Sequence, residues 1–181
     1  MCTCNALFKS KRGFILSATS QSWENVSSKL KKTMSKVETL KKYITENETY
    51  DNDFWDLGGN KSLRFLMIDF SSEDWYDLKN QTKNWSSHQL CILADALIDD
   101  NTKFEFDVNE FYGELFTIVD DSEADYLIQH IKIIDDGKAK PLELLVSIKN
   151  RIEKLKKYTE KIHNVHDYAD YFFFIDKLIK A

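Results

Sequence analysis

Residues 86–98 read SSHQLCILADALI, and this stretch decides the fold class. Ser86 stands three residues before Gln89, the spacing at which a hydroxyl and an amide side chain cap the first turn of a helix reciprocally. The apolar residues that follow fall at i, i+3, i+4, i+7 and i+8, which places them on one helix face: Leu90, Leu93, Ala94, Leu97 and Ile98. The stretch therefore predicts a capped amphipathic helix.

The same start signal recurs along the middle of the chain, where a capping oxygen stands three residues before an acidic side chain. The pairs are Ser71 with Asp74, Asp107 with Glu110, and Ser122 with Asp125. One apolar face follows Asp107 (Val108, Phe111, Tyr112, Leu115, Val119), and another follows Ser122 (Ala124, Leu127, Ile131, Ile134). Each pair predicts the beginning of another helix.

The remaining segments of the chain also show the spacing of apolar residues that is typical of helices. A long helix is expected from about Ser22 to Glu46, since one stripe joins Trp23, Val26, Leu30, Thr33, Val37, Leu40 and Ile44. Gly58-Gly59 predicts a break, and Leu63, Leu66, Met67 and Phe70 then form a helical face, with a strand as the alternative. Gly137 is expected at the C-cap of the preceding helix, and Pro141 at the first position of the next. The apolar face of that next helix consists of Leu145, Ile148, Ile152, Leu155 and Ile162. Asn164 is expected to cap a last helix through Tyr168, Phe172, Ile175 and Ile179, and residues 103–108 are a second strand candidate.

Composition agrees with helices. The 181 residues include five glycines and one proline, few for a β-rich chain, and are 43% hydrophobic. We predict an all-α, single-domain bundle over residues 1–181 with about seven or eight amphipathic helices, minor short strands, and an extended or poorly ordered segment at 1–20. Three cysteines favour a reducing compartment, and no apolar run reaches the length of a signal peptide or a membrane span. A cytoplasmic location is therefore expected.

The charges are sorted into three blocks. Residues 1–45 carry nine Lys or Arg against two Asp or Glu, residues 46–136 carry six against twenty-two, and residues 137–181 carry ten against six. The net charges of the blocks are therefore +7, −16 and +4. Sorting of this kind influences which partners approach and how fast, and it says nothing direct about the fold.

Acidic residues of the middle block cluster beside aromatic ones, which is typical of a surface that docks a basic protein. The candidate partner-binding residues are Asp51, Asp53, Trp55, Asp56, Glu73, Asp74, Trp75, Asp77, Asp99 and Asp100. Nucleic acid would be repelled there, because phosphates need Lys and Arg. Two alternatives remain open: the aromatic residues are core while the acids face water, or the basic flanks pair with the acidic middle.

The sequence contains no recognisable catalytic, cofactor-binding or metal-binding motif. A calcium loop counted from Asp51 fails at Trp55, Asp56 and Ser62, and Cys2 with Cys4 has no second ligand pair for zinc. His163 and His166 could clip a metal, and His166-Asp167 is superficially similar to the dyad of HD-domain phosphohydrolases, but only fourteen residues follow Asp167. Ordinary surface histidines explain the pair better. We expect no cofactor, no metal and no enzyme activity.

The segment Lys83–Ile98, a Trp-Ser helix start followed by a Leu/Ala face, resembles stretches in immunity proteins of bacterial polymorphic-toxin and type VI secretion systems. The resemblance covers sixteen residues and general acidic character, and it carries no binding residue over. It implies a stoichiometric inhibitor that lays its acidic surface over the active site of a cognate basic toxin. We further expect a monomer or homodimer that binds neither nucleic acid nor membrane.

Two other functions stay open. The first is a helical adaptor or regulator that binds nucleic acid, an acidic membrane surface or another protein through its basic helices, at Lys29 to Lys42 and Lys149 to Lys161. The second is a metal-dependent hydrolase of unrecognised type. A gel shift would test the first, and metal analysis the second.

Overall fold

The computed structural model describes residues 34–98, 104–162 and 167–181. By its internal contacts the chain divides into two units, residues 1–34 and 35–181, and the account below concerns the second. The predicted domain over 1–181 includes residues 1–33, so in that extent it stays a prediction. Cys2, Cys4, Asp99, Asp100, His163, Asn164 and His166 lie outside the described residues.

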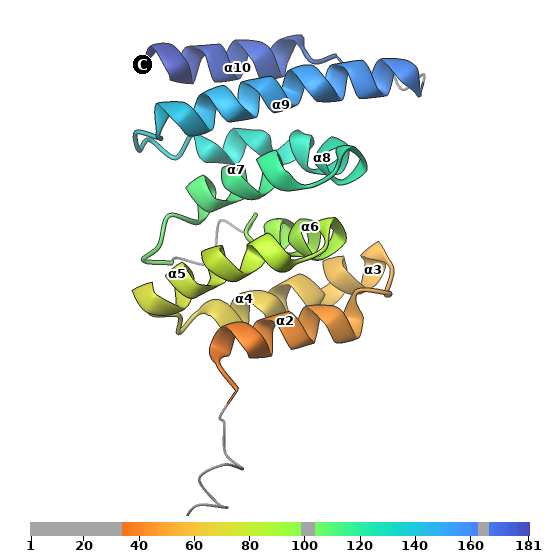
Figure 1. Ribbon diagram of the computed structural model, residues 1–181, viewed down its shortest axis with the longest axis vertical. Coiled ribbons are helices and arrows are strands. Elements are labelled where there is room, and N and C mark those ends of the chain that lie inside the picture. Colours follow the sequence, from red (N-terminus) through yellow and green to blue (C-terminus); the bar gives the residue numbers. More distant parts are fainter. Residues whose placement is uncertain (1–33, 99–103, 163–166) are drawn as a thin grey trace, which may run out of the picture. The chain divides into compact units, whose positions relative to one another are not determined.

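The second unit consists of helices joined by short connections (Figure 1). In chain order these are α2 (Lys36–Asn47), α3 (Asn52–Phe54), the π-helical turn η1 (Trp55–Gly59), α4 (Asn60–Met67), α5 (Ser72–Gln81), the 3₁₀ turn η2 (Thr82–Asn84), α6 (Ser87–Ala96), α7 (Val108–Ile118), α8 (Asp121–Leu127), the 3₁₀ helix η3 (Ile128–Ile134), α9 (Leu142–Lys161) and α10 (Ala169–Lys180). The prediction of an all-α fold is confirmed. Both strand alternatives are wrong within the described ranges, since residues 60–67 are helical and 104–107 form no strand.

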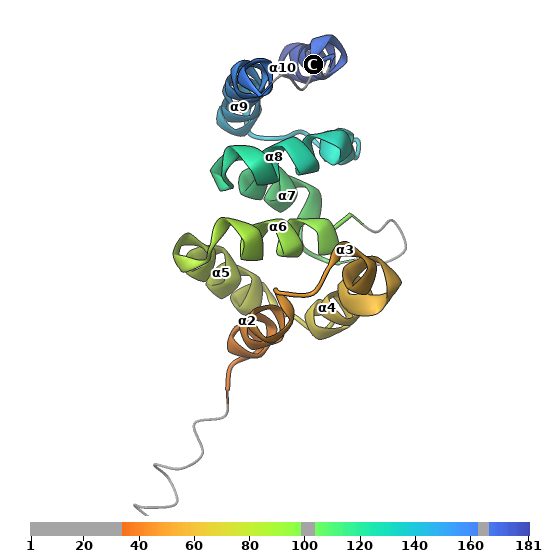
Figure 2. The same cartoon turned by 90° about the vertical axis from the view of Figure 1, so that its right-hand side faces the viewer.

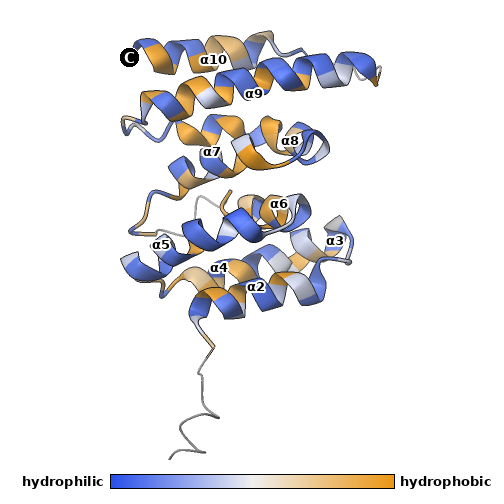
Figure 3. Cartoon of the chain, viewed as in Figure 1, coloured by the Kyte–Doolittle hydropathy of each residue, from blue (hydrophilic) through white to orange (hydrophobic). Residues whose placement is uncertain are grey.

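The helices pack in layers along the unit. α6 contacts α2 and α4 on one side and α7 and α8 on the other, and α9 lies between α7 with α8 and α10 (Figure 2). Apolar and polar residues alternate along the helices (Figure 3), as expected where each helix buries one face against the next layer. None of the helices in the described part is long and apolar enough to cross a membrane.

α6 is the most completely buried helix of this stack. Leu90, Leu93, Ala94 and Leu97 of the predicted face are at most 4% exposed. Ser86 and Gln89 form the predicted capping box, because the Ser86 hydroxyl accepts from the Gln89 amide and the Gln89 side chain accepts from Ser86 N–H. Ser71 with Asp74 forms the same box, and Asp107 caps α7 through Glu110 N–H. These three predicted helix starts are confirmed.

Other boundaries differ from the prediction. Ser35 is the N-cap of α2 and forms a capping box with Glu38, so no continuous helix runs through residues 34 and 35. α8 is capped by Asp120, whose carboxylate accepts from Glu123 N–H, and not by Ser122. Pro141 is the N-cap of α9 instead of its first residue, and Ile162 is half exposed just beyond that helix. Gly137 has the left-handed φ of 79° but lies in the loop after η3.

Candidate functional site

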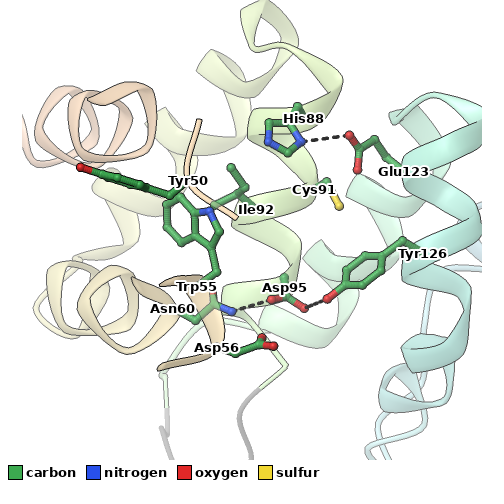
Figure 4. Close-up of a pocket in the computed structure, with 10 residues that line it drawn as sticks. All are labelled: Tyr50, Trp55, Asp56, Asn60, His88, Cys91, Ile92, Asp95, Glu123 and Tyr126. Carbon is green, nitrogen blue, oxygen red and sulfur yellow. Dashed lines mark hydrogen bonds and ion pairs between the residues drawn. The ribbon is translucent and has the colours of Figure 1, made fainter. Parts of the chain in front are cut away.

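A pocket of about 200 Å³ lies where α6 meets η1, α4 and α8 (Figure 4). Its α6 wall consists of His88, Cys91, Ile92 and Asp95, which follow the i, i+3, i+4, i+7 spacing of one helix face. α8 contributes Glu123 and Tyr126, one turn apart. The remaining lining residues come from the segment 50–60: Tyr50, Trp55, Asp56 and Asn60.

The π-helical turn η1 places Trp55 and Asp56 at this pocket. The turn depends on Gly59, because a Cβ at Gly59 would lie 2.7 Å from Trp55 Cε3 and 2.9 Å from Phe54 Cε1. Trp55 is 5% exposed and packs edge-on against Tyr43 and Phe54. The backbone of this segment is kinked at Gly58, whose φ of 170° and ψ of −15° are non-helical, and the kink sets Trp55 and Asp56 apart from the axis of α4.

Asp95 is the polar centre of the pocket. Its Oδ2 accepts from Asn60 Nδ2 and its Oδ1 from the Tyr126 hydroxyl at 3.2 Å. Asn60 is 9% exposed, and its Oδ1 has no hydrogen-bond partner among the residues that the structure describes. Trp55 Nε1, also buried, is likewise without a partner. Since buried polar atoms are nearly always hydrogen-bonded, two unsatisfied atoms in one pocket wall point to a bound group or water.

His88 and Glu123 close one end of the pocket (Figure 4). His88 Nδ1 lies 3.0 Å from Glu123 Oε1, and Nε2 lies 3.1 Å from the carbonyl oxygen of Glu48. Both ring nitrogens thus face acceptors, so the doubly protonated ring makes both hydrogen bonds and the neutral ring makes only one. Gln89 holds the same loop by donating to the Glu48 side chain at 2.7 Å.

Cys91 is unsuited to nucleophilic chemistry. Burial, together with a hydrogen bond to the Glu123 carboxylate, raises the pKa of its thiol far above the usual range. Burial and the neighbouring Asp95 also raise the pKa of Tyr126. Besides Cys91 and the tyrosines, the ionisable side chains that line the pocket are Asp56, Asp95, Glu123 and His88. Across residues 34–98, 104–162 and 167–181, no group of three or more His, Cys, Asp or Glu is placed to hold a metal ion.

The structure separates the predicted partner-binding residues. Asp51, Asp53 and Asp56 are exposed beside the pocket, and we call these three the acidic rim. Asp51 also accepts from Phe54 N–H at 3.2 Å. No lysine or arginine pairs with the acidic rim within the described ranges.

The second predicted cluster, around Trp75, belongs to the core. The Trp75 ring is 2% exposed and stacks on Phe106 with 4.6 Å between centroids, so it is no exposed anchor. Asp74 caps α5 and pairs with Lys36 at 3.0 Å, and Asp77 accepts from Gln81. Glu73 of this cluster is exposed. For both tryptophans the core alternative is correct.

Internal pairing, the other alternative, holds for part of the acidic block. Lys140 lies 2.7 Å from Asp107 and 3.0 Å from Asp136, and Arg151 lies 2.7 Å from Asp121. With Lys36 and Asp74, these contacts join carboxylates of the middle block to cations of both flanks. Asp51, Asp53 and Asp56 are among the acids that have no Lys or Arg partner within the described ranges.

No protein-family model, no curated protein and no solved structure matches this chain.

Sequence reasoning missed Asn60, His88, Asp95, Glu123 and Tyr126. The available signal was the spacing of His88, Cys91 and Asp95, which places three ionisable side chains on one face of the α6 helix. The other faces of this helix are apolar and buried, so a face with ionisable groups is a candidate binding surface.

Proposed function

We propose that this chain is a stoichiometric binding protein, an immunity protein that inhibits a basic toxin by covering its active site. The acidic rim and the pocket behind it are the docking region in this proposal. The observation that carries the proposal is a cluster of three exposed carboxylates, Asp51, Asp53 and Asp56, that no Lys or Arg of the described residues pairs with. Asp74, Asp107 and Asp121, by contrast, pair with the basic flanks.

Physical chemistry supports such a role for the rim. Exposed carboxylates free of internal partners attract a basic protein over a distance near the Debye length and raise its association rate. The exposed ring of Tyr50 beside them offers an apolar contact, since Tyr50 is 55% exposed. The resemblance of Lys83–Ile98 to immunity proteins adds the class of partner, a toxin encoded beside its inhibitor.

The test is binding to the product of the adjacent reading frame. The two proteins are co-expressed, purified and mixed at two salt concentrations, and the association rate is measured by surface plasmon resonance. Replacing the rim (Asp51→Asn, Asp53→Asn, Asp56→Asn) is expected to slow association about tenfold or more at low salt. Asparagine keeps the Asp51 cap, so folding is preserved.

A matched control removes three exposed acids elsewhere: Asp135→Asn, Glu153→Gln and Glu160→Gln. This control changes the net charge equally, so only a location effect separates the two variants. Equal association rates for both variants, or binding that ignores salt, would contradict docking through the rim.

The adaptor alternative has one supporting feature, the exposed lysines of α9 at Lys154, Lys156, Lys157 and Lys161. Glu153 and Glu160 interrupt this stretch, and Lys149 pairs with Asp176 at 2.6 Å. A gel shift with duplex and single-stranded nucleic acid at low salt distinguishes the alternatives. Retention that disappears with salt would favour the adaptor.

A further inference from the structure

We infer that the pocket between η1, α4, α6 and α8 receives a guanidinium group, the side chain of an arginine on the protein partner. The inference rests on the proposed function for the identity of the partner, but its chemistry follows from the pocket itself. Three of the lining residues carry hydrogen-bond acceptors: Asn60 through its unpaired Oδ1, and Asp95 and Asp56 through their carboxylates.

The unsatisfied oxygen of Asn60 identifies the ligand as a donor. Asn60 is 9% exposed and its amide nitrogen is already used by Asp95, which fixes Oδ1 as the group left to accept. A carboxylate accepts up to about four hydrogen bonds, and Asp95 has two here, so it also retains capacity. A ligand with several N–H donors satisfies both residues together.

The charge of the lining identifies the donor as a cation. No lysine or arginine is among the lining residues, and the Tyr126 hydroxyl donates to Asp95 without neutralising it. An anionic ligand would meet the carboxylates of Asp56 and Asp95 at close range and is disfavoured, since His88 at the end of the pocket already contacts Glu123. A neutral amide could satisfy Asn60, but a cation also makes the stronger charge-assisted hydrogen bonds to the two carboxylates.

Shape favours guanidinium over ammonium. The aromatic rings of Trp55, Tyr50 and Tyr126 line the pocket, and a planar guanidinium stacks on such faces while its five N–H groups reach several acceptors. The volume of about 200 Å³ is below the roughly 300–1,000 Å³ of pockets that hold drug-sized ligands, so one side chain is the appropriate size.

Trp55 favours a peptide over a free amine as the source. Its buried Nε1–H has no acceptor in the described part of the chain, and a simple alkylguanidinium has none to offer. A peptide arginine brings backbone carbonyl oxygens that can accept this hydrogen bond. The same atom is a local probe, because its indole N–H signal reports on the pocket directly.

The experiment titrates the full ¹⁵N-labelled chain with N-acetyl-arginine amide and follows the Trp55 indole N–H resonance, assigned with Trp55→Phe. We expect a saturable shift with a Kd of roughly 1 mM or tighter. The neutral isostere N-acetyl-citrulline amide should bind at least about tenfold more weakly, because it lacks the charge. Methylguanidinium should also bind more weakly, because it lacks the carbonyl.

Variants place the binding in the pocket. Asp95→Asn should abolish the shift, and Asp56→Asn, at an exposed site where folding is unaffected, should raise Kd about fivefold or more. The matched control Asp77→Asn, on α5 outside the pocket, should leave Kd unchanged. Circular dichroism confirms that each variant is folded.

Each outcome bears on one claim. Absence of a saturable Trp55 shift overturns the inference, even if the toxin complex forms and the proposed function survives. Equal binding of citrulline overturns the cationic ligand, and tighter binding of methylguanidinium overturns the peptide source. Arginine binding that requires Asp56 and Asp95 supports the pocket, even where the adjacent gene product fails to bind and the proposed function is lost.

Discussion

Replacing Lys140 with methionine tests whether the basic flank stabilises the acidic middle. The Lys140 side chain is 2% exposed, and its Nζ donates to both carboxylate oxygens of Asp107 at 2.9 and 2.7 Å. It also lies 3.0 Å from Asp136. Asp107 in turn caps α7 by accepting from Glu110 N–H at 2.8 Å. One ammonium group thus connects the loop before α9 to the beginning of α7.

The expected loss of stability is about 3 kcal/mol. Removing one partner of a buried ion pair typically costs about 3–5 kcal/mol, because the remaining charge is left uncompensated. Asp107 and Asp136 are 27% and 16% exposed, so water screens them in part and the lower end applies. At about 2–4 °C per kcal/mol for a chain of this size, Tm should fall by roughly 6–12 °C.

Lys138→Met is the matched control. Lys138 approaches the same two carboxylates at 3.8 and 3.7 Å, but its side chain is 64% exposed. Exposed pairs contribute about 0–1 kcal/mol, so Tm should change little. Thermal unfolding by differential scanning calorimetry measures both variants. Equal losses for Lys138→Met and Lys140→Met would refute the reasoning.

Acid provides a second check with a defined sign. Burial alone would raise the pKa of Asp107 and of Asp136, but the hydrogen bonds from Lys140 and from backbone N–H groups outweigh it and lower both. A lowered folded-state pKa gives stability that is present above the unfolded value of 3.8 and is lost as pH falls through the folded value. The Tm difference between Lys140→Met and the parent should therefore be full at pH 7 and shrink below about pH 4. A difference of constant size would contradict the ion-pair origin.

Three further predictions test the helix boundaries and the pocket wall. Gly59→Ala should destabilise the chain by about 1–3 kcal/mol in urea unfolding, since its Cβ would meet Trp55, whereas Gly58→Ala, with no atom within 4 Å, should change stability by less than about 0.5 kcal/mol. Asp120→Ala should cost about 1 kcal/mol of stability through loss of the α8 cap, and Ser122→Ala should cost less than about 0.5 kcal/mol. A larger loss for Ser122→Ala than for Asp120→Ala would show that Ser122 is the cap, as the sequence predicts. Cys91 is tested in a variant whose two N-terminal cysteines are replaced by serine. Its reaction with a thiol reagent at pH 8 should be at least about 100-fold slower in the folded protein than in urea. Comparable rates in the two conditions would show that the thiol is accessible in the folded protein.

The buried faces of the helices could be predicted from sequence because helical periodicity is a local property. Leu40, Ile44, Leu63 and Leu93 were each placed on an apolar face, and each is fully buried. A residue on such a face is buried wherever the helix docks, so no knowledge of the neighbouring layers is needed.

Helix boundaries were harder to predict, because at the start of α8 two overlapping pairs of residues show the same capping-box spacing. Asp120 precedes Glu123 by three residues and Ser122 precedes Asp125 by three, and both registers bury Ala124 and Leu127. A tertiary contact accompanies the observed choice: Asp120 N–H donates to the Ser87 hydroxyl at 2.7 Å. At Ser35 the signal Ser-x-x-Glu was present, but the long apolar stripe through residues 23–44 concealed it.

The pocket could not be predicted because its residues come from segments far apart in the chain. Asn60 and Asp95 are 35 positions apart and His88 and Glu123 also 35, and helix packing alone brings them together. Trp55 shows the same limit, because its acidic neighbours suggested an exposed ring. The π-helical turn directs that ring inward while leaving Asp53 and Asp56 in water.

The sorted charges of the sequence therefore have two physical roles that the structure separates. Asp74, Asp107, Asp121 and Asp136 pair with Lys or Arg of the flanks, so a partner could engage them only by breaking internal ion pairs. Such a competition lowers affinity by the strength of the pair that is lost. The acidic rim involves no such competition within the described ranges, because its three carboxylates have no lysine or arginine to release. In the proposed complex, the exposed carboxylates that are free of such pairs within the described ranges, the acidic rim among them, would therefore contribute most to the field that a basic partner meets at close range.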